Sequence, residues 1–316
     1  MDNSLATAAF AGPGIVEVAP RDGLQNEART LSPTQRVDLI DRAVAAGARR
    51  VEAVAFVHPL RVPQMAGAEE VMSLLKRPPG VRYSGLVLNA RGMERACASG
   101  VHEINYVVVA GDSFSRRNQG VGTREALAAW EGIASRAHGE GIGRSLTIAA
   151  AFGCPFEGET SEAAVAELAR IGAETGAEEI VLADTIGVGA PDAVTRLLTA
   201  VREQAPEAVL RCHFHNTRNT GYANAVAAAA AGAAWLDSSL GGIGGCPFAP
   251  AATGNIATED LVYLLRRMGL EPGIDLESAA AAGTWLGSVL GIEVPALLGR
   301  AGPFPGPAGS STRGDE

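Results

Sequence analysis

The stretch that decides the fold is IVEVAPRDGLQNE, at residues 15–27. It begins with a short run rich in β-branched residues that Pro20 ends, which is typical of a buried strand followed by a turn. Arg21 and Asp22 then stand side by side before Gly23, so the strand delivers two charges to a loop. Such a pair either caps a turn on a solvated surface or faces a ligand, and the rest of the chain decides between the two.

A second cluster, His213-Phe214-His215, also stands at the end of an apolar run. Residues i and i+2 of a strand point to the same face, so both imidazoles can reach one ion. The two clusters meet only if their strands lie close together in one sheet.

The chain alternates apolar runs with segments of helical periodicity. We expect strands from residue 15 onward and at residues 50–56, 81–87, 103–109, 145–151, 178–183, 208–214 and 235–238. We expect helices at residues 35–46, 65–76, 91–99, 123–139, 162–175, 192–204, 221–231 and 258–268. Strands joined by single helices run parallel, and eight such units close into a (β/α)8 TIM barrel, an α/β fold. A doubly wound open sheet is the alternative architecture.

A single large domain fits the 316 residues, because α/β barrels of about 250 residues or more are single domains. We expect a short N-terminal segment at residues 1–13 and the barrel domain at residues 14–290, with an extra helix at residues 275–290. Residues 291–316 end in a stretch rich in proline, glycine and serine, which predicts a flexible tail.

The composition narrows the class of protein. A chain with 47% hydrophobic and 19% charged residues can bury a large core. A net charge of −9 and a pI near 5.2 argue against a nucleic-acid partner. The N-terminal residues lack the features of a signal or transit peptide. No apolar run is long enough to span a membrane, so we expect no membrane partner. Four cysteines without CxxC spacing fit a reducing compartment, so we expect a cytoplasmic protein.

The ligand site of a barrel lies at the C-terminal ends of its strands. The polar groups expected there are Arg21, Asp22 and Gln25 after the first strand, Glu52 inside the second, Asp184 and Thr185 after the sixth, His213 and His215 on the seventh, and Cys246 and Asn255 after the eighth. Glu52 stands in an apolar strand, which costs free energy unless the acid is paired. Its partner is a structural arginine or Arg21 of the site, and the two interpretations are compatible.

Four of these groups form a candidate metal site. Only the eighth strand separates the first and seventh in a closed barrel, so Asp22 lies near His213 and His215. Together with Asn255 they would offer two nitrogen and two oxygen ligands, which suit Mg²⁺ or Mn²⁺ better than a closed thiolate zinc site. The alternative is a pair of histidines satisfied within the core.

The loop GGIGGCPF at residues 241–248 is rich in glycine and contains Cys246. It lacks the Lys-Ser/Thr pair that follows a P-loop, so a phosphate cradle is a weak interpretation. A lid that carries Cys246 over a bound substrate is the better one. A small buried cysteine in a turn is the alternative.

Several segments together resemble the hydroxymethylglutaryl-CoA lyase family, part of the metal-dependent lyase and Claisen-synthase barrels. They are VEVAPRDGLQNE at residues 16–27, FVHP at 56–59, VPQM at 62–65, GCPFEG at 153–158, DTIGVG at 184–189, GGCPF at 244–248 and TGNIATED at 253–260. The resemblance extends over residues 14–290.

The resemblance implies a retro-Claisen cleavage of a 3-hydroxyacyl-CoA, foremost 3-hydroxy-3-methylglutaryl-CoA, to acetyl-CoA and acetoacetate. It implies the same four ligands for Mg²⁺ or Mn²⁺ and a homodimer, and it points to leucine degradation. The implied site residues are the catalytic Arg21, Cys246, Asp184 and Glu52, the substrate-binding Arg21, Gln25, Thr185 and Thr217, and the metal-binding Asp22, His213, His215 and Asn255. Arg21 would face the thioester carbonyl, and Cys246 would exchange a proton with the reacting carbons.

The sequence departs from the family pattern at three places. Asn216-Thr217-Arg218 stands where the family typically has Asp-Thr-Tyr, and His58 stands where it usually has a small serine. Residues 291–298 lack the basic and polar side chains that the family uses toward CoA. Another short 3-hydroxyacyl-CoA, such as a citramalyl-like thioester, is therefore the alternative substrate.

The sequence leaves two further alternatives open. A Claisen-type synthase of the same barrel group would normally carry a large C-terminal extension. A catalytically silent barrel kept as a binding module would have no need of the full set of reactive residues, because a fold by itself requires none of them.

Overall fold

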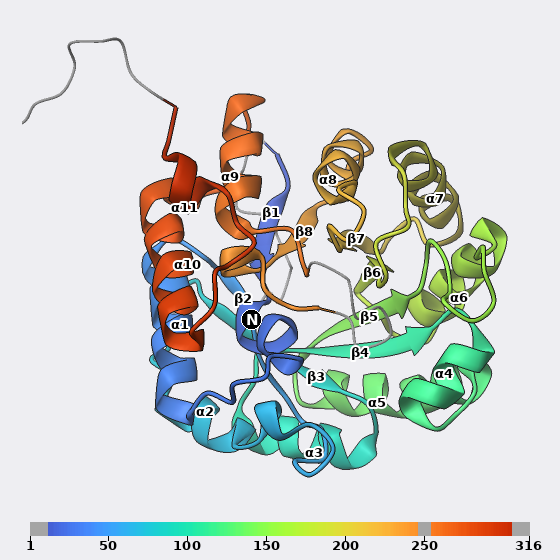
Figure 1. The fold of residues 1–316 in the computed structure, drawn as a ribbon. Coiled ribbons are helices and arrows are strands. Elements are labelled where there is room, and N and C mark those ends of the chain that lie inside the picture. The colour runs from blue at the N-terminus through green and yellow to red at the C-terminus, as the bar shows by residue number, and fades with distance from the viewer. Residues whose placement is uncertain (1–11, 246–253, 305–316) are drawn as a thin grey trace, which may run out of the picture.

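The computed structural model describes residues 12–245 and 254–304. Eight parallel strands close into a barrel in chain order, and β1 pairs with both β2 and β8 (Figure 1). The strands are β1 (Gly14–Glu17), β2 (Arg50–Ala55), β3 (Arg82–Val87), β4 (Glu103–Val109), β5 (Gly143–Ala149), β6 (Glu179–Asp184), β7 (Val209–Phe214) and β8 (Trp235–Ser238). The predicted TIM barrel is confirmed, and the open sheet is excluded because no edge is left between β1 and β8.

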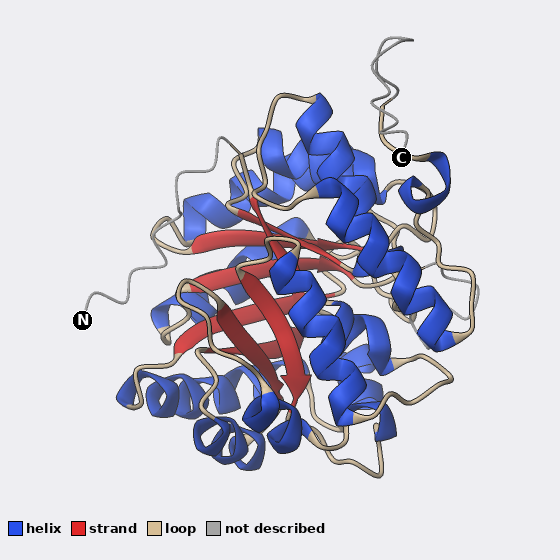
Figure 2. Cartoon of the chain, turned by 90° about the vertical axis from the view of Figure 1, so that its left-hand side faces the viewer, coloured by secondary structure: helices blue, strands red, loops and turns tan. Residues whose placement is uncertain are grey.

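Helices cover the outside of the barrel, and Figure 2 shows the strands inside this helical layer. They are α1 (Pro33–Ala45), α2 (Ala68–Leu74), α3 (Ala90–Ser99), α4 (Asp112–Gln119), α5 (Thr123–Gly139), α6 (Glu162–Glu174), α7 (Pro191–Gln204), α8 (Gly221–Ala230), α9 (Thr258–Arg267), α10 (Leu276–Leu290) and α11 (Leu298–Ala301). Short helical turns are η1 (Ala19–Gly23), η2 (Pro63–Met65) and η3 (Leu240–Gly242). Within the described residues, none of the helices has the length and apolarity needed to span a membrane.

Helix α1 begins where local sequence chemistry predicts it. The Ser32 hydroxyl accepts a hydrogen bond from the Gln35 amide (3.2 Å), and the Gln35 side chain accepts one from the Ser32 amide (3.0 Å). Pro33 occupies the first helical position, where its missing N–H costs nothing. This capping box ends the loop that carries the RDG turn and starts the first crossover toward β2.

Helix α4 is the main difference from the expected alternation, because β4 is followed by two helices rather than one. Its sequence is polar and has no apolar periodicity. Tertiary hydrogen bonds hold it instead: the Asp112 carboxylate accepts from the Thr123 amide (3.0 Å), and Glu157 accepts from the Ser113 amide (2.6 Å). Partners 11 and 44 residues away cannot be read from helical spacing.

Residues 291–304, within the segment expected as a tail, include the short helix α11. The Asp260 carboxylate of α9 accepts hydrogen bonds from the amides of Leu297 (2.9 Å) and Leu298 (2.8 Å). The side of α9 thus anchors the start of α11. The rest of the expected tail, residues 305–316, lies outside the described residues.

Toward the N-terminal ends of the strands, the barrel interior is filled by ion pairs. Arg50 contacts Glu103 (2.6 Å) and Glu179 (2.7 Å), and Arg211 contacts Glu179 (3.3 Å), all with buried side chains. Removing one partner of such a pair leaves a buried charge uncompensated and costs about 3–5 kcal/mol. These pairs form the floor on which the candidate site rests.

Glu17 at the end of β1 ties the RDG turn to the C-terminal half of the chain. Its buried carboxylate accepts hydrogen bonds from the amides of Ala19 (2.8 Å) and Leu240 (3.0 Å) and from the Thr258 hydroxyl (2.7 Å). Burial is the largest influence on this group and raises its pKa to about 7, against the lowering effect of the hydrogen bonds.

Glu17→Gln should flatten the pH dependence of folding stability. The folded-state pKa of about 7 lies above the ordinary value of 4.5, so between these values the folded protein binds more protons than the unfolded chain. The stabilisation is fully present below pH 4.5 and is lost as the pH rises through 7, by an amount on the order of 3 kcal/mol. Urea unfolding at pH 5 and pH 8 measures the difference.

Glutamine keeps an acceptor for the backbone amides but does not titrate. The loss of unfolding free energy between the two pH values should therefore be smaller in Glu17→Gln than in the parent protein. Glu259→Gln provides a second case, because burial raises the pKa of Glu259 to about 8. Identical losses in the parent and in Glu17→Gln would contradict the assignment.

Candidate active site

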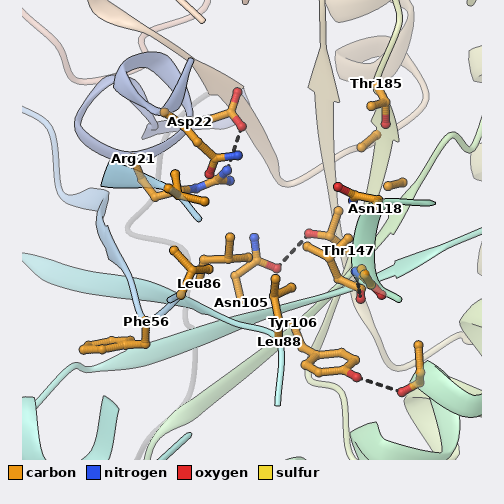
Figure 3. Close-up of a pocket in the computed structure, with 18 of the residues that line it drawn as sticks. Arg21, Asp22, Phe56, Leu86, Leu88, Asn105, Tyr106, Asn118, Thr147 and Thr185 are labelled. Carbon is orange, nitrogen blue, oxygen red and sulfur yellow. Dashed lines mark hydrogen bonds and ion pairs between the residues drawn. The ribbon is translucent and has the colours of Figure 1, made fainter. Parts of the chain in front are cut away.

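A cavity of about 650 Å³ opens at the C-terminal ends of the strands (Figure 3). Of the residues that the sequence indicates, the cavity is lined by Arg21, Asp22, Gln25, Thr185, His213 and His215. Glu52 and Asn255 contact this lining from behind, whereas Asp184 and Thr217 are not part of it. Cys246 lies outside the described residues.

The turn η1 positions Arg21 and Asp22. It is closed by hydrogen bonds from the amides of Arg21 and Gly23 to the Val18 carbonyl, each 3.1 Å long. Gly23 is required for packing, because a Cβ there would lie 2.8 Å from the Ser239 hydroxyl of the loop after β8. The close contact fixes the turn against the segment that leads to Asn255.

Arg21 is held by two carboxylates. Its guanidinium donates to Asp22 Oδ1 (2.7 Å) and to Glu52 Oε2 (2.6 Å), so of the two kinds of partner considered for Glu52 the structure shows Arg21. The other Glu52 oxygen accepts a hydrogen bond from Nδ2 of the Asn105 side chain (3.0 Å). Oδ1 of Asn105 accepts one in turn from the Thr147 hydroxyl (2.7 Å). Figure 3 shows Asn105 and Thr147 joined in the cavity. A guanidinium fixed in this way needs little rearrangement to meet a developing negative charge.

Asn105 and Thr147 were not among the predicted site residues. Both line the cavity and lie on the inner faces of β4 and β5. The available signal was a polar residue inside an apolar strand, the same feature that drew attention to Glu52.

Asp22 and the two histidines form a compact cluster. Asp22 Oδ2 lies 3.8 Å from His213 Nε2 and 3.9 Å from His215 Nε2. One ligand atom from each residue lies within 4.8 Å of the others. These distances would allow a single cation to bind all three groups at once.

Asn255 completes the cluster from the loop after β8. Its Nδ2 donates to Asp22 Oδ2 (2.9 Å) and to the Ile243 carbonyl (3.0 Å). Its buried Oδ1 has no hydrogen-bond partner in the part of the chain that the structure describes. Gly244 permits this approach: its φ is 114°, and a Cβ there would lie 2.4 Å from Asn255 Nδ2. An orphaned buried oxygen beside a carboxylate and two imidazoles fits a divalent cation.

The pKa values of these groups also support a metal site. Burial would raise the pKa of Asp22, but Arg21 and the two histidines outweigh it and hold that pKa well below its usual range. Burial, followed by the neighbouring His213, lowers the pKa of His215 to about 4. At neutral pH the cluster therefore offers an ionised carboxylate and a neutral imidazole, which are the forms that bind metals.

Asp184 has a different place from the one expected for a group facing substrate. Its two oxygens accept hydrogen bonds from the amides of Val188 and Gly189, each 2.9 Å long. The carboxylate therefore closes the loop after β6. Thr185, the next residue, lines the cavity, and its hydroxyl accepts from the Ala150 amide (2.8 Å).

The Asn216-Thr217-Arg218 segment also serves this loop. Arg218 Nη1 donates to the carbonyls of Ile186 (2.9 Å) and Gly187 (3.0 Å), so the cation that the sequence places beside the metal site caps the β6 loop. A Cβ at Gly187 would lie 2.8 Å from Thr217, which shows how closely the two segments pack.

A buried acid that sequence reasoning missed is Asp237 in β8. Its Oδ2 lies 3.0 Å from His213 Nδ1, and its Oδ1 pairs with Arg211. Like Glu52, Asp237 is an acid inside an apolar strand, where burial costs free energy unless the acid is paired, so the sequence does carry a signal for it.

Fold and site together define a TIM-barrel enzyme with a candidate divalent-metal centre at the barrel mouth. The family model described as HMGL-like matches residues 13–285. The chain therefore belongs to the hydroxymethylglutaryl-CoA lyase family, and it is a carbon–carbon lyase.

Three similar proteins illustrate the relationship. The chain is 45% identical over 299 residues to the (R)-citramalyl-CoA lyase of Chloroflexus aurantiacus, covering 92% of this chain and 94% of that one. It is 43% identical over 277 residues to the hydroxymethylglutaryl-CoA lyase of Pseudomonas mevalonii, covering 88% and 92%. The solved structure of an HMG-CoA lyase from Acinetobacter baumannii in complex with coenzyme A and 3-methylmalate matches with a TM-score of 0.88 and 37% identity, covering 93% and 98%.

Proposed function

We propose that this lyase cleaves a 3-hydroxy-3-methylacyl-CoA whose acyl chain ends in a carboxylate, and that 3-hydroxy-3-methylglutaryl-CoA is its substrate. The products are acetyl-CoA and acetoacetate. The observation that carries the proposal is the contact between Arg21 and Asp22 (2.7 Å), which joins a fixed cation to a candidate metal cluster in one cavity. The two curated relatives reported above are both named as CoA-ester lyases, which supports the thioester.

The reaction shifts electron pairs from the 3-hydroxyl toward the thioester. The 3-hydroxyl loses its proton and becomes a ketone, the C2–C3 bond breaks, and negative charge develops on C2 and the thioester oxygen. A proton added at C2 gives acetyl-CoA. A bound Mg²⁺ or Mn²⁺ would supply Lewis acidity toward the 3-hydroxyl and a neighbouring carboxylate or carbonyl oxygen.

The residues of the chain then have separate tasks. Asp22, His213, His215 and Asn255 hold the cation. Arg21 stabilises the charge on the thioester oxygen, and Glu52 keeps the guanidinium in place through its 2.6 Å contact. Cys246 is our candidate for proton exchange with C2, following the glycine-rich loop on which it stands.

Asp184 acts in this proposal through the loop after β6. By accepting the Val188 and Gly189 amides it positions Thr185, whose side chain lines the cavity. Thr185 and Gln25 are candidates for contacts to the substrate, and Thr217 supports the same loop by packing against Gly187.

The second candidate substrate is (R)-citramalyl-CoA, favoured by the relative of that name at 45% identity. The two thioesters share the 3-hydroxy-3-methyl centre and differ by one methylene before the terminal carboxylate. One methylene changes kcat/KM by about 10- to 200-fold in a fitted pocket, so the comparison is decisive.

Purified enzyme with Mg²⁺ or Mn²⁺ should release acetyl-CoA from 3-hydroxy-3-methylglutaryl-CoA with a kcat/KM at least about 10-fold above that for (R)-citramalyl-CoA. EDTA should stop the reaction, and added metal should restore it. The reverse preference would assign the citramalyl substrate. Absence of acetyl-CoA from both thioesters would overturn the proposal.

Assembly as a homodimer and a cytoplasmic location stay predictions. Size-exclusion chromatography with light scattering tests the first. Fractionation of the source cells tests the second.

A further inference from the structure

The two histidines of the cluster are held in different ways. His213 Nδ1 lies 3.0 Å from Asp237 Oδ2, whereas the buried His215 Nδ1 has no hydrogen-bond partner among residues 12–245 and 254–304. The backbone of His215 is bridged to Asn255, which fixes its position instead. Only the His213 ring is thus oriented by an acid.

The register of β7 and β8 brings Asp237 to His213. Cys212 pairs with Leu236, so the next residue of each strand, His213 and Asp237, stand beside each other. Asp237 is 4% exposed and cannot turn to solvent. Its second oxygen pairs with Arg211, so both oxygens are used and the carboxylate has one orientation.

The contact with Asp237 determines which ring nitrogen of His213 carries a proton. An ionised carboxylate only accepts hydrogen bonds, so His213 Nδ1 carries the hydrogen and donates it. In the neutral ring Nε2 is then the nitrogen with the lone pair, and it is the atom that lies 3.8 Å from Asp22 Oδ2. Held in this way, the neutral ring directs the lone pair of Nε2 into the cluster.

The barrel floor keeps Asp237 ionised and in place. Arg211 pairs with Asp237 and also with Glu179 (3.3 Å), and Glu179 pairs with Arg50 (2.7 Å). Positive and negative groups alternate along this buried row. The charge of Asp237 is thus balanced from below, on the side away from the cavity mouth.

We infer that Asp237 is a positioning residue for the metal centre: it sets the tautomer and ring angle of His213, and Arg211 holds it in that role. The inference rests on the proposed function in one respect, the use of His213 as a metal ligand. Carboxylates that accept from a ligating histidine commonly contribute 10- to 100-fold in metal affinity.

The test compares the parent protein with Asp237→Asn, both stripped of metal by EDTA. Mn²⁺ titration followed by the EPR signal of free Mn²⁺ should show the dissociation constant rising about 10- to 100-fold in the variant. Long-range ¹H–¹⁵N spectra of the metal-free proteins should show His213 protonated at Nδ1 in the parent. In the variant the Nε2-protonated form should be populated, because an asparagine amide can donate to Nδ1.

The matched control is Ser145→Ala. Ser145 donates to Glu179 (2.8 Å), so the change removes a buried polar contact from the floor and leaves Asp237 and Arg211 intact. Its Mn²⁺ affinity should stay within about twofold of the parent, well below the cost expected at a positioning acid. If Asp237→Asn fails to fold, Asp237→Asn with Arg211→Met removes both charges of the pair and gives the same readouts.

Unchanged Mn²⁺ affinity and an unchanged His213 tautomer in the Asp237 variants would overturn the inference and leave the acid a structural partner of Arg211. A parent protein that binds no Mn²⁺ would overturn the metal centre of the proposed function instead. In that case the spectra of the metal-free protein still decide whether Asp237 sets the tautomer.

Discussion

Arg21→Gln should lower kcat for acetyl-CoA release by about 10³-fold, since loss of one preorganised donor to a developing oxyanion costs about 10²–10³ and this residue also carries the charge. Glutamine keeps a polar group of similar length but loses the cation that faces the thioester. The guanidinium is buried and is fixed by Asp22 and Glu52. Single-turnover kinetics at saturating metal measure the effect.

Two comparisons separate the charge from its geometry. Arg21→Lys restores a cation without the two-pronged contact to both carboxylates, so its kcat should lie between those of the parent and the glutamine variant. Arg29→Gln removes an exposed arginine outside the cavity lining and should leave kcat unchanged. A glutamine variant that keeps the kcat of the parent would refute the role assigned to Arg21.

Asp22→Ala should abolish metal binding in the micromolar range and with it the lyase activity. The cluster would keep two imidazoles and an amide oxygen but lose its carboxylate, the group that offsets the charge of the cation. Substitution of groups behind a ligand already costs 10- to 100-fold in metal affinity, so removal of the ligand itself should cost more than about 100-fold. Isothermal titration with Mn²⁺ measures the affinity directly.

Asp184→Asn is the control for this prediction. Asp184 is buried and close to the cluster, but both of its oxygens hold the loop after β6. Its Mn²⁺ affinity should remain within about threefold of the parent, far from the loss expected for a ligand. Equal losses in the two variants would mean that Asp22 acts through local structure rather than as a ligand.

Much of the fold follows from local patterns. The alternation of apolar runs with helical segments predicts the closed barrel, because short crossovers force the strands to run parallel. Ser32 and Pro33 mark the start of α1 through a capping box that needs only neighbouring residues. Helix α4 escaped prediction, because hydrogen bonds to Thr123 and Glu157 hold a segment with no apolar stripe.

The site also has features that follow from the sequence and features that do not. The positions of His213 and His215 on one face follow from strand geometry, and the closeness of Asp22 follows from barrel closure. The directions of Asp184 and Arg218 do not, because each depends on which backbone groups of the β6 loop happen to be within reach. Asp237 is recognisable in the sequence as an acid inside an apolar strand, but its contact with His213 is set by strand register.

The sequence by itself determined the barrel, the turn that presents Arg21 and Asp22, and the group of residues that gather at the strand ends. These depend on periodicity, turn chemistry and chain connectivity, which act between near neighbours. Only the tertiary structure decided that Glu52 holds Arg21, that Asn255 Oδ1 has no hydrogen-bond partner among the described residues, and that Asp237 lies against His213 Nδ1. The physical reason is that a hydrogen bond between residues 24 or more positions apart depends on strand register and side-chain direction to within an ångström.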